Sequence, residues 1–319
     1  MAAAVETMMY AGNVPWHGEG QYVGDHDVLS AEAMKQARLG WSVNKTDIYA
    51  SLEGGDVYIP GSRAMVRDSD QKVLGIVGKN YEPLQNSEAF QLMDELVEEG
   101  DVRYHTAGAL DGGRKVFLLA KIGGYEVVPG DLVDKFILLY NSHDGSGAVR
   151  WLPTEVRVVC ANTVALALGK GRGDGLAVRH TRNMKTRLGE ARNIFGIAQH
   201  ELKKREDFSR MLANTRMTDM EFREFSNILI PDPAEGKSVT RAQNNRDKLQ
   251  NLYLMGRGAE IPGVRFTGWA AYNAVTEYVN YSRSSKGGQS NRFQSALFGS
   301  GEKLIRKAED TLNTMLLAA

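Results

Sequence analysis

Eight basic residues near the middle of the chain have the type and spacing that a phosphate-binding surface requires. Between residues 170 and 216, lysines and arginines far outnumber aspartates and glutamates. A row of cations can bind the backbone of a nucleic acid without reading its sequence, because the cations neutralise its phosphates. We therefore predict nucleic-acid binding by Lys170, Arg172, Arg179, Arg182, Lys185, Arg192, Lys203 and Arg210.

Four of these cations are predicted to share one face of a helix. Lys185, Arg192, Lys203 and Arg210 follow one another at intervals of seven, eleven and seven residues, so they fall within about 20° of one another around a helix axis. An apolar stripe is expected beside them, at Leu188, Ala191, Phe195, Ala198 and Leu202. The competing interpretation is an ordinary solvated surface, whose cations pair with the acidic N-terminal half or with Glu190, Glu201, Glu206 and Asp207.

The segment Asn141–Gly147 contains a histidine next to an aspartate, His143 and Asp144, which could serve a metal-dependent nuclease. No second carboxylate or histidine follows at ligand spacing, and Asp144-Gly145 is typical of a hairpin turn. We interpret the segment as a turn. No HxxxH, CxxC or paired-carboxylate motif occurs elsewhere, so we predict no metal site.

Other catalytic motifs are missing as well. The sequence has no GxxxxGK[ST] phosphate loop and no GxSxG elbow. The single cysteine, Cys160, lies at the end of an apolar strand, where a thiol is unreactive. We therefore predict a protein that is not an enzyme, with no catalytic residues, no cofactor and no small-molecule substrate.

The elements that position these residues differ between the two halves of the chain. In the first half, helices are expected at 30–39, 86–99 and 162–168, and β-strands at 41–50, 56–67, 72–77, 102–110, 114–122, 135–141, 148–152 and 155–159. Asp111-Gly112-Gly113 is a strong hairpin signal, because the turn needs positive φ. Strands joined by short turns favour an antiparallel or mixed sheet with packed helices.

The second half is predicted to be mainly helical, over 185–212, 219–229, 240–255, 268–281 and 302–317. Charge divides at the same place: residues 1–180 contain about 17 Lys and Arg against about 24 Asp and Glu, and residues 181–319 about 22 against about 15. We therefore predict an α+β fold with an acidic α+β domain at 1–180 and a basic helical region, packed on it, at 181–319.

The compartment follows from cysteine usage and hydropathy. One cysteine cannot form an intramolecular disulfide, residues 1–10 lack the pattern of a secretory signal, and no apolar run reaches the length of a membrane span. We expect a protein of the cytoplasm, without a membrane partner.

Several short motifs carry a likeness to a known family. They are Pro15–Gly18, Asn141–Ser146, Val156–Thr163, Arg179–Thr181, Trp269–Tyr278 and Ala296–Gly299. Together they resemble an uncharacterised phage- and plasmid-like protein family, number 932 among the domains of unknown function, over nearly the whole chain. The chain departs from the family pattern after Tyr278, where an acidic residue and a histidine are expected and the sequence reads Val279-Asn280-Tyr281.

The resemblance implies a habitat more than a chemistry: phages, prophages and conjugative plasmids, near genes for single-strand binding and recombination. With the basic helix, it favours a DNA-metabolism protein of the bacterial host cytoplasm that binds single-stranded DNA as a homo-oligomer, in recombination or annealing. The alternative is a non-enzymatic interaction or assembly factor of a phage, either anti-defence or virion-associated. A nuclease that uses His143 and Asp144 is the third hypothesis.

Overall fold

The structure, a computed structural model, falls into two compact units that are interleaved along the chain. Unit 1 comprises residues 1–123, 136–153 and 172–199, and unit 2 comprises 124–135, 154–171 and 200–319. The residues described are 5–12, 20–25, 28–97, 103–157, 162–164, 176–184, 186, 191–234, 239–284, 295–296 and 299–317. The division at residue 180, which rests on charge and helical pattern, stays a prediction.

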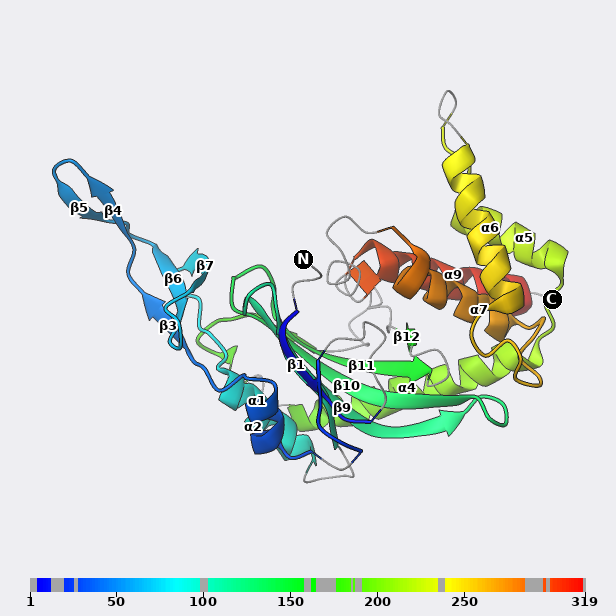
Figure 1. The fold of residues 1–319 in the computed structure, drawn as a ribbon, viewed down its shortest axis with the longest axis horizontal. Coiled ribbons are helices and arrows are strands. Elements are labelled where there is room, and N and C mark those ends of the chain that lie inside the picture. Colours follow the sequence, from blue (N-terminus) through cyan, green and yellow to red (C-terminus); the bar gives the residue numbers. More distant parts are fainter. Residues whose placement is uncertain are drawn as a thin grey trace. The chain divides into compact units, whose positions relative to one another are not determined.

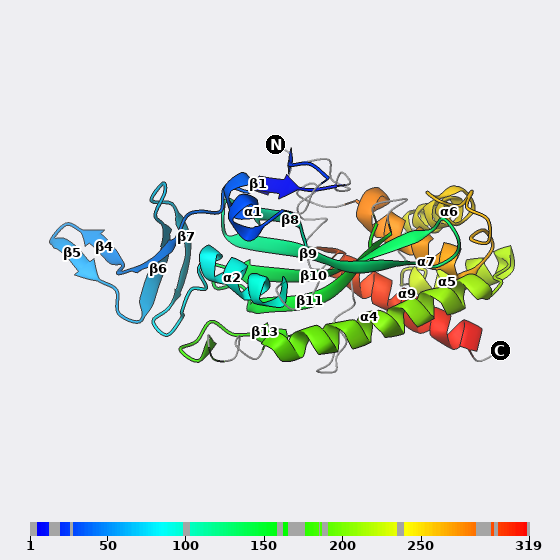
Figure 2. The same ribbon diagram turned by 90° about the horizontal axis from the view of Figure 1, so that it is seen from below.

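The α+β fold class is confirmed. The largest sheet has the strand order β12-β11-β10-β9-β8-β1-β2, and β13 also pairs with β11 (Figure 2). Its strands are β1 (Val5–Tyr10), β2 (Gln21–Tyr22), β8 (Arg103–Leu110), β9 (Lys115–Glu126), β10 (Leu132–Ser142), β11 (Val149–Arg157), β12 (Asn162–Val164) and β13 (Leu176–Val178). The sheet is mixed, because β1 pairs with β2 in parallel and with β8 in antiparallel orientation.

The hairpin predicted at Asp111-Gly112-Gly113 is confirmed. It joins β8 to β9, which pair in antiparallel orientation. All three residues have positive φ, at 52°, 66° and 87°. Glycine adopts such angles without steric cost, which explains why two glycines occur together here.

Two short sheets form a projection of unit 1 (Figure 1). The first has the order β3-β6-β7, and the second consists of β4 and β5 alone. Their bounds are β3 (Val43–Thr46), β4 (Tyr49–Leu52), β5 (Gly55–Tyr58), β6 (Ser62–Arg67) and β7 (Val73–Gly78). We call the β4–β5 hairpin the arm.

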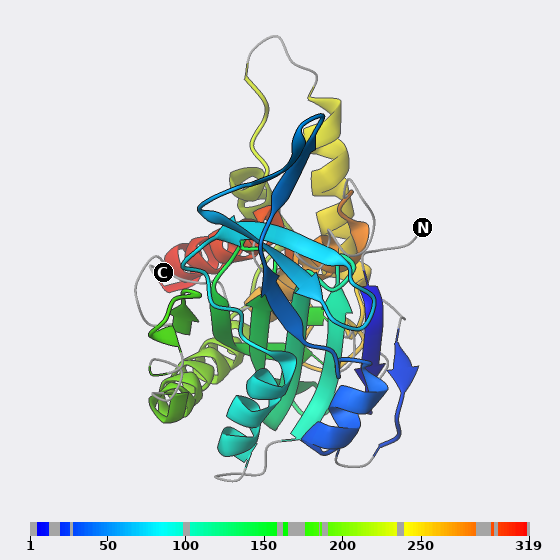
Figure 3. The same cartoon turned by 90° about the vertical axis from the view of Figure 1, so that its left-hand side faces the viewer.

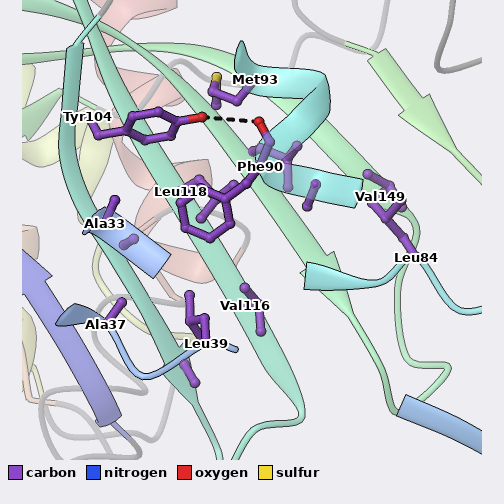
Figure 4. Packing of buried hydrophobic residues seen from close by; sticks show 14 of the residues in the cluster. Ala33, Ala37, Leu39, Leu84, Phe90, Met93, Tyr104, Val116, Leu118 and Val149 are labelled. Atoms are coloured by element: carbon purple, nitrogen blue, oxygen red, sulfur yellow. Dashed lines mark hydrogen bonds between the residues drawn. The ribbon is translucent and has the colours of Figure 1, made fainter. Parts of the chain in front are cut away.

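Helices α1 (Ser30–Gln36) and α2 (Asn86–Val97) form the core of unit 1 with the large sheet. Figures 3 and 4 show both helices against the strands. Phe90 and Met93 of α2 are buried against Leu118 and Val116 of β9. The Tyr104 hydroxyl of β8 donates to the Phe90 carbonyl oxygen at 3.1 Å, which fixes α2 to the sheet.

Unit 2 is built around one buried helix. Its helices are α4 (Ala191–Asn214, of which residues 200–214 belong to unit 2), α5 (Asp219–Leu229), α6 (Thr240–Met255), α7 (Gly268–Glu277), the π-helical turn η2 (Tyr278–Ser282) and α9 (Ser300–Leu317). Every residue of α7 is buried. The indole NH of its Trp269 donates a hydrogen bond to the Asp131 carboxylate at 2.8 Å. The buried indole NH is therefore satisfied.

Several details differ from the sequence-based expectations. The three strands expected at 41–50, 56–67 and 72–77 are five, since the first comprises β3 and β4 and the second β5 and β6. The helix predicted at 162–168 is wrong where it is described, because Asn162–Val164 is strand β12, paired with β11. Strands β1 and β2 were not predicted, since their glycine-rich surroundings are typical of a loop. The two strands expected at 148–152 and 155–159 are one strand, β11, which continues through Pro153.

Among the described residues, no helix is both long and apolar enough to span a bilayer.

Candidate nucleic-acid interface

The eight predicted binding residues are distributed over both units, and only some can be described. Lys170, Arg172 and Lys185 lie outside the described residues, and Arg192 lies in α4 without a described side chain. Arg179 and Arg182 are exposed in unit 1. The remaining two, Lys203 and Arg210, are exposed on the part of α4 that belongs to unit 2.

Lys203 and Arg210 share one acidic neighbour. The Glu206 carboxylate lies 3.4 Å from the Lys203 Nζ and 3.2 Å from the Arg210 guanidinium, and Asp207 lies 3.0 Å from Lys203. These are the intrahelical ion pairs of the competing interpretation. Ion pairs of exposed cations stabilise a protein little, so a phosphate can displace them.

Arg182 lines a cleft of unit 1 with a volume of about 460 Å³. Two of the other lining residues are Glu82 and Glu88. Glu82 is paired with Lys45 at 3.0 Å. A cleft with two carboxylates beside one arginine is poorly suited to a polyanion, because like charges repel.

Helix α6 presents a better surface in unit 2. Arg241, Asn244, Lys248, Asn251 and Met255 are all exposed, and their spacing of three and four residues places them on one helix face. Only Ala242, Leu249 and Tyr253 of α6 are buried. The helix stands out from its unit at its N-terminal end (Figure 1), so its polar face is accessible.

Two further arginines continue this face beyond the end of α6. Arg265 donates to the Leu254 carbonyl oxygen at 3.3 Å and lies 3.7 Å from the Met255 sulfur. Arg265 and Arg216 line the same cleft, of about 580 Å³, in which Glu260 is the single acidic residue among those described. We call Arg241, Lys248, Arg265 and Arg216 the basic row.

The cations of the basic row share the absence of ion pairs in the described structure. Within the part of the chain that the structure describes, none of its four cations forms a salt bridge with a carboxylate. By contrast, Arg246 of unit 2 pairs with Asp232 at 2.7 Å, and Arg205 pairs with Glu309 at 2.8 Å. Four cations without a described ion pair favour a positive potential, which attracts anions.

An exposed aromatic residue lies beside the row. Phe266 is 38% exposed, and the guanidinium carbon of Arg265 lies 5.9 Å from the centre of its ring. Its φ of 58° is rare for a residue with a side chain. The conformation is held by the hydrogen bond from the Met217 backbone NH to the Phe266 carbonyl oxygen, at 3.0 Å. A ring presented in this way can stack on a base.

Sequence inspection missed the row because tertiary structure creates it. The seven-residue interval between Arg241 and Lys248 was a visible signal, and α6 has few apolar residues to bury. Arg216 and Arg265 are 49 positions apart in the sequence. They reach one cleft because Arg216 forms a β-bridge with Thr267, the residue that caps α7.

The turn predicted around Asp144 is confirmed, and hydrogen bonds from a buried lysine stabilise it. Lys115 donates to Asp144 Oδ1 at 2.8 Å, to Ser142 Oγ at 3.3 Å and to Ser146 Oγ. Although burial opposes ionisation, the hydrogen bonds from Lys115, Ser142 and Ser146 lower the pKa of Asp144 to about 2. We call these four residues the Lys115 cluster.

His143 points into the core of unit 1. It is fully buried, its Nε2 lies 3.2 Å from Asn86 Oδ1, and its ring contacts Trp41 edge-on. Burial lowers its pKa to about 3, so the ring is neutral. Over the described residues, no group of three or more histidines, cysteines or carboxylates is arranged to hold a metal ion. The geometry of this segment is that of a structural anchor.

The fold and the basic row define an α+β protein with an anion-attracting surface on its helical unit. The family model of DUF932, a domain of unknown function, matches residues 73–307. The chain therefore belongs to the DUF932 family. No curated protein and no solved structure gives a significant match to this chain.

Proposed function

We propose that this chain binds single-stranded nucleic acid without catalysis, in the DNA metabolism of a phage or plasmid in the host cytoplasm. A recombination or annealing protein is the form we favour. The observation that carries the proposal is the basic row, in which four exposed cations of unit 2 have no carboxylate partner among the described residues. Free cations are those that gain most from binding phosphates, since no ion pair has to be broken first.

The composition of the surface favours a single strand over a duplex. Arg241 and Lys248 are two turns apart on α6 and can contact successive parts of one backbone. Asn244 lies between them and Asn251 follows Lys248 on the same face, so the amides of both can bond to base edges. Phe266 offers a stacking platform, which only unpaired bases can use.

Fluorescence anisotropy of a labelled single-stranded oligonucleotide tests the proposal, at about 50 mM and about 200 mM salt and without metal. The variant Lys248→Gln/Arg265→Gln is expected to bind roughly 10- to 100-fold more weakly, because two charged contacts are lost. Its plot of log affinity against log salt should be shallower by about 1.4, at about 0.7 per phosphate contact. All oligonucleotide sequences should be affected alike.

Two controls make the result specific. Lys35→Gln/Lys79→Gln removes the same charge from exposed positions of unit 1 and should leave the affinity and the salt slope close to those of the wild type. Lys203→Gln/Arg210→Gln tests the α4 stripe, where both cations already pair with Glu206. If only this last variant loses affinity, α4 and not the basic row is the binding surface. If the wild type does not bind at low salt, the proposed function is wrong.

The same oligonucleotide tests the hypothesis that the protein is a nuclease. With Mg²⁺ or Mn²⁺ present, we expect full-length oligonucleotide to persist, since His143 is fully buried and neutral. Degradation by the wild type that disappears in His143→Ala would establish the nuclease hypothesis instead. Gel electrophoresis of the labelled strand gives the answer.

A further inference from the structure

Exposed apolar side chains are concentrated on the arm and next to it. Its two strands pair only with each other among the described strands, and every residue of β5 is exposed. The exposed apolar side chains are Tyr49, Leu52, Val57, Tyr58 and Ile59. A lone two-stranded hairpin is marginally stable in water, and clustered exposed apolar groups mark interaction surfaces.

Side-chain contacts hold the arm together at its root. The rings of Tyr49 and Tyr58 pack across the strands at 5.7 Å, and the Arg63 guanidinium lies 5.6 Å from the centre of the Tyr58 ring. Arg63 also pairs with Asp47 at 3.0 Å. A preformed element loses little conformational entropy when it binds, so the arm is suited to docking.

Arg67 fixes the strand that follows the arm. It is buried between Glu6, which it contacts with two hydrogen bonds of 2.8 Å, and Asp70. Its guanidinium also lies over the Trp41 ring at 5.3 Å. The three-stranded sheet that carries the arm is thereby held to β1 of the large sheet within unit 1.

The charge of the arm restricts its partner. Between Asp47 and Ile59 the chain has three carboxylates and no lysine or arginine. Asp47 is paired with Arg63, which leaves the charges of Glu53 and Asp56 near the tip. Nucleic acid and anionic lipid are repelled by such a surface. The fitting partner is a protein surface that combines cations with exposed apolar groups.

The basic row of unit 2 is a surface of this kind. Besides its cations it exposes Met255, which is 76% exposed, and Phe266. We infer that the arm of one copy of this chain docks on the basic row of a second copy. The carboxylates at the tip of the arm face the cations, while Tyr49 and Tyr58 cover Met255 and Phe266.

The contact joins two different surfaces, so it is heterologous. Each copy that uses its arm keeps a free basic row, and the next copy can dock there. Assembly therefore closes when two copies exchange arms, closes into a larger ring, or continues as an open filament. Because the contact is partly ionic, it weakens as salt rises.

Nucleic acid and the arm would then compete for the same cations, a consequence that rests on the proposed function. Adding oligonucleotide is expected to dissociate the assemblies, to an extent that follows the fraction of basic rows with bound oligonucleotide. If the oligonucleotide binds through Lys248 and Arg265, as the variant Lys248→Gln/Arg265→Gln tests, and the assemblies persist, the arm does not use the basic row. The inference is then overturned while the proposed function stands.

Sedimentation velocity of the full chain at rising protein concentration, without nucleic acid, tests the contact directly. Glu53→Lys places a cation at the exposed tip of the arm, and Lys248→Glu places a carboxylate in the basic row. Each variant alone is expected to raise the apparent dissociation constant roughly five- to tenfold. Mixing the two variants should restore assembly, since each contact between one variant and the other joins opposite charges again.

The mixing step separates docking from misfolding, because two misfolded variants would not restore each other. Lys35→Glu provides a matched charge reversal outside both surfaces and should leave the assembly unchanged. A wild type that stays monomeric at every soluble concentration overturns the inference. So does a mixture that remains as dissociated as its two components.

Discussion

Glu155→Gln is expected to stabilise the protein at pH 8 by about 3 kcal/mol. The Glu155 side chain is buried in unit 2, and its Oε1 has no hydrogen-bond partner in the described structure. Burial raises its pKa to about 7, although Arg205, Lys135 and Tyr125 all favour the ionised form. The charge is therefore held at a net cost, of about 1.4 kcal/mol for each unit by which the pKa is raised.

The pH dependence follows from the direction of the shift. Below the unfolded-state pKa of 4.5, the carboxyl is neutral in both states and costs nothing. Between 4.5 and about 7 the unfolded state loses its proton first, so stability falls as pH rises. Above this window the full penalty applies, and glutamine, which is neutral and of the same shape, avoids it.

Urea unfolding of the wild type and the variant at pH 5 and pH 8 measures the effect. The advantage of Glu155→Gln should be large at pH 8 and small at pH 5. Glu224→Gln, at an exposed position of α5, should change stability little at either pH. A variant that is less stable than the wild type at pH 8 would mean that the ionised Glu155 contributes favourably through Arg205 and Lys135.

Lys115→Met is expected to destabilise the protein by roughly 3–5 kcal/mol, because it leaves a carboxylate without its buried partner. The side chains of Lys115 and Asp144 are 9% and 16% exposed, and their charged atoms are 2.8 Å apart. Gly75 of β7 packs so closely on the backbone of Asp144 that a Cβ there would lie 2.6 Å from Asp144 Cα. The turn therefore cannot move easily to hydrate the orphaned charge.

A double-mutant cycle shows whether the charge is responsible. Asp144→Asn keeps a hydrogen-bonding side chain but removes the charge, so Lys115→Met/Asp144→Asn should be more stable than Lys115→Met alone. Lys79→Met, at an exposed position, controls for the loss of a lysine. Purely additive losses in chemical unfolding would show that Lys115 acts by packing and not by neutralising Asp144.

Local signals made several parts of the fold predictable. The Asp111-Gly112-Gly113 turn requires positive φ, and an aspartate followed by two glycines is a sequence that favours such angles. The N-terminus of α5 is fixed by Thr218 and Glu221, whose side chains cap each other's backbone NH groups. Each of these features depends on residues fewer than five positions apart, so no knowledge of the tertiary structure is needed.

Features that depend on distant partners escaped prediction. Asn162–Val164 pairs with Glu155–Arg157, and this pairing overrides the local preference that suggested a helix. The candidate site shows the same limit. The α4 cations were predicted from their helical spacing, but whether a cation is free depends on what lies near it in space. Arg216 and Arg265 come close together because Arg216 forms a β-bridge with Thr267.

The complete burial of α7 has a consequence for the rates at which backbone amides exchange with solvent. Every residue of Gly268–Glu277 is buried, and a Cβ on Gly268 would already meet Leu316 of α9 at 2.7 Å. Such a helix cannot open by itself, so its amides exchange deuterium only when the whole unit unfolds. Deuterium uptake by α7 would therefore report the global stability of unit 2, while uptake by the projecting end of α6 would report local opening. The motif Trp269–Tyr278 would then be the slowest-exchanging part of this unit.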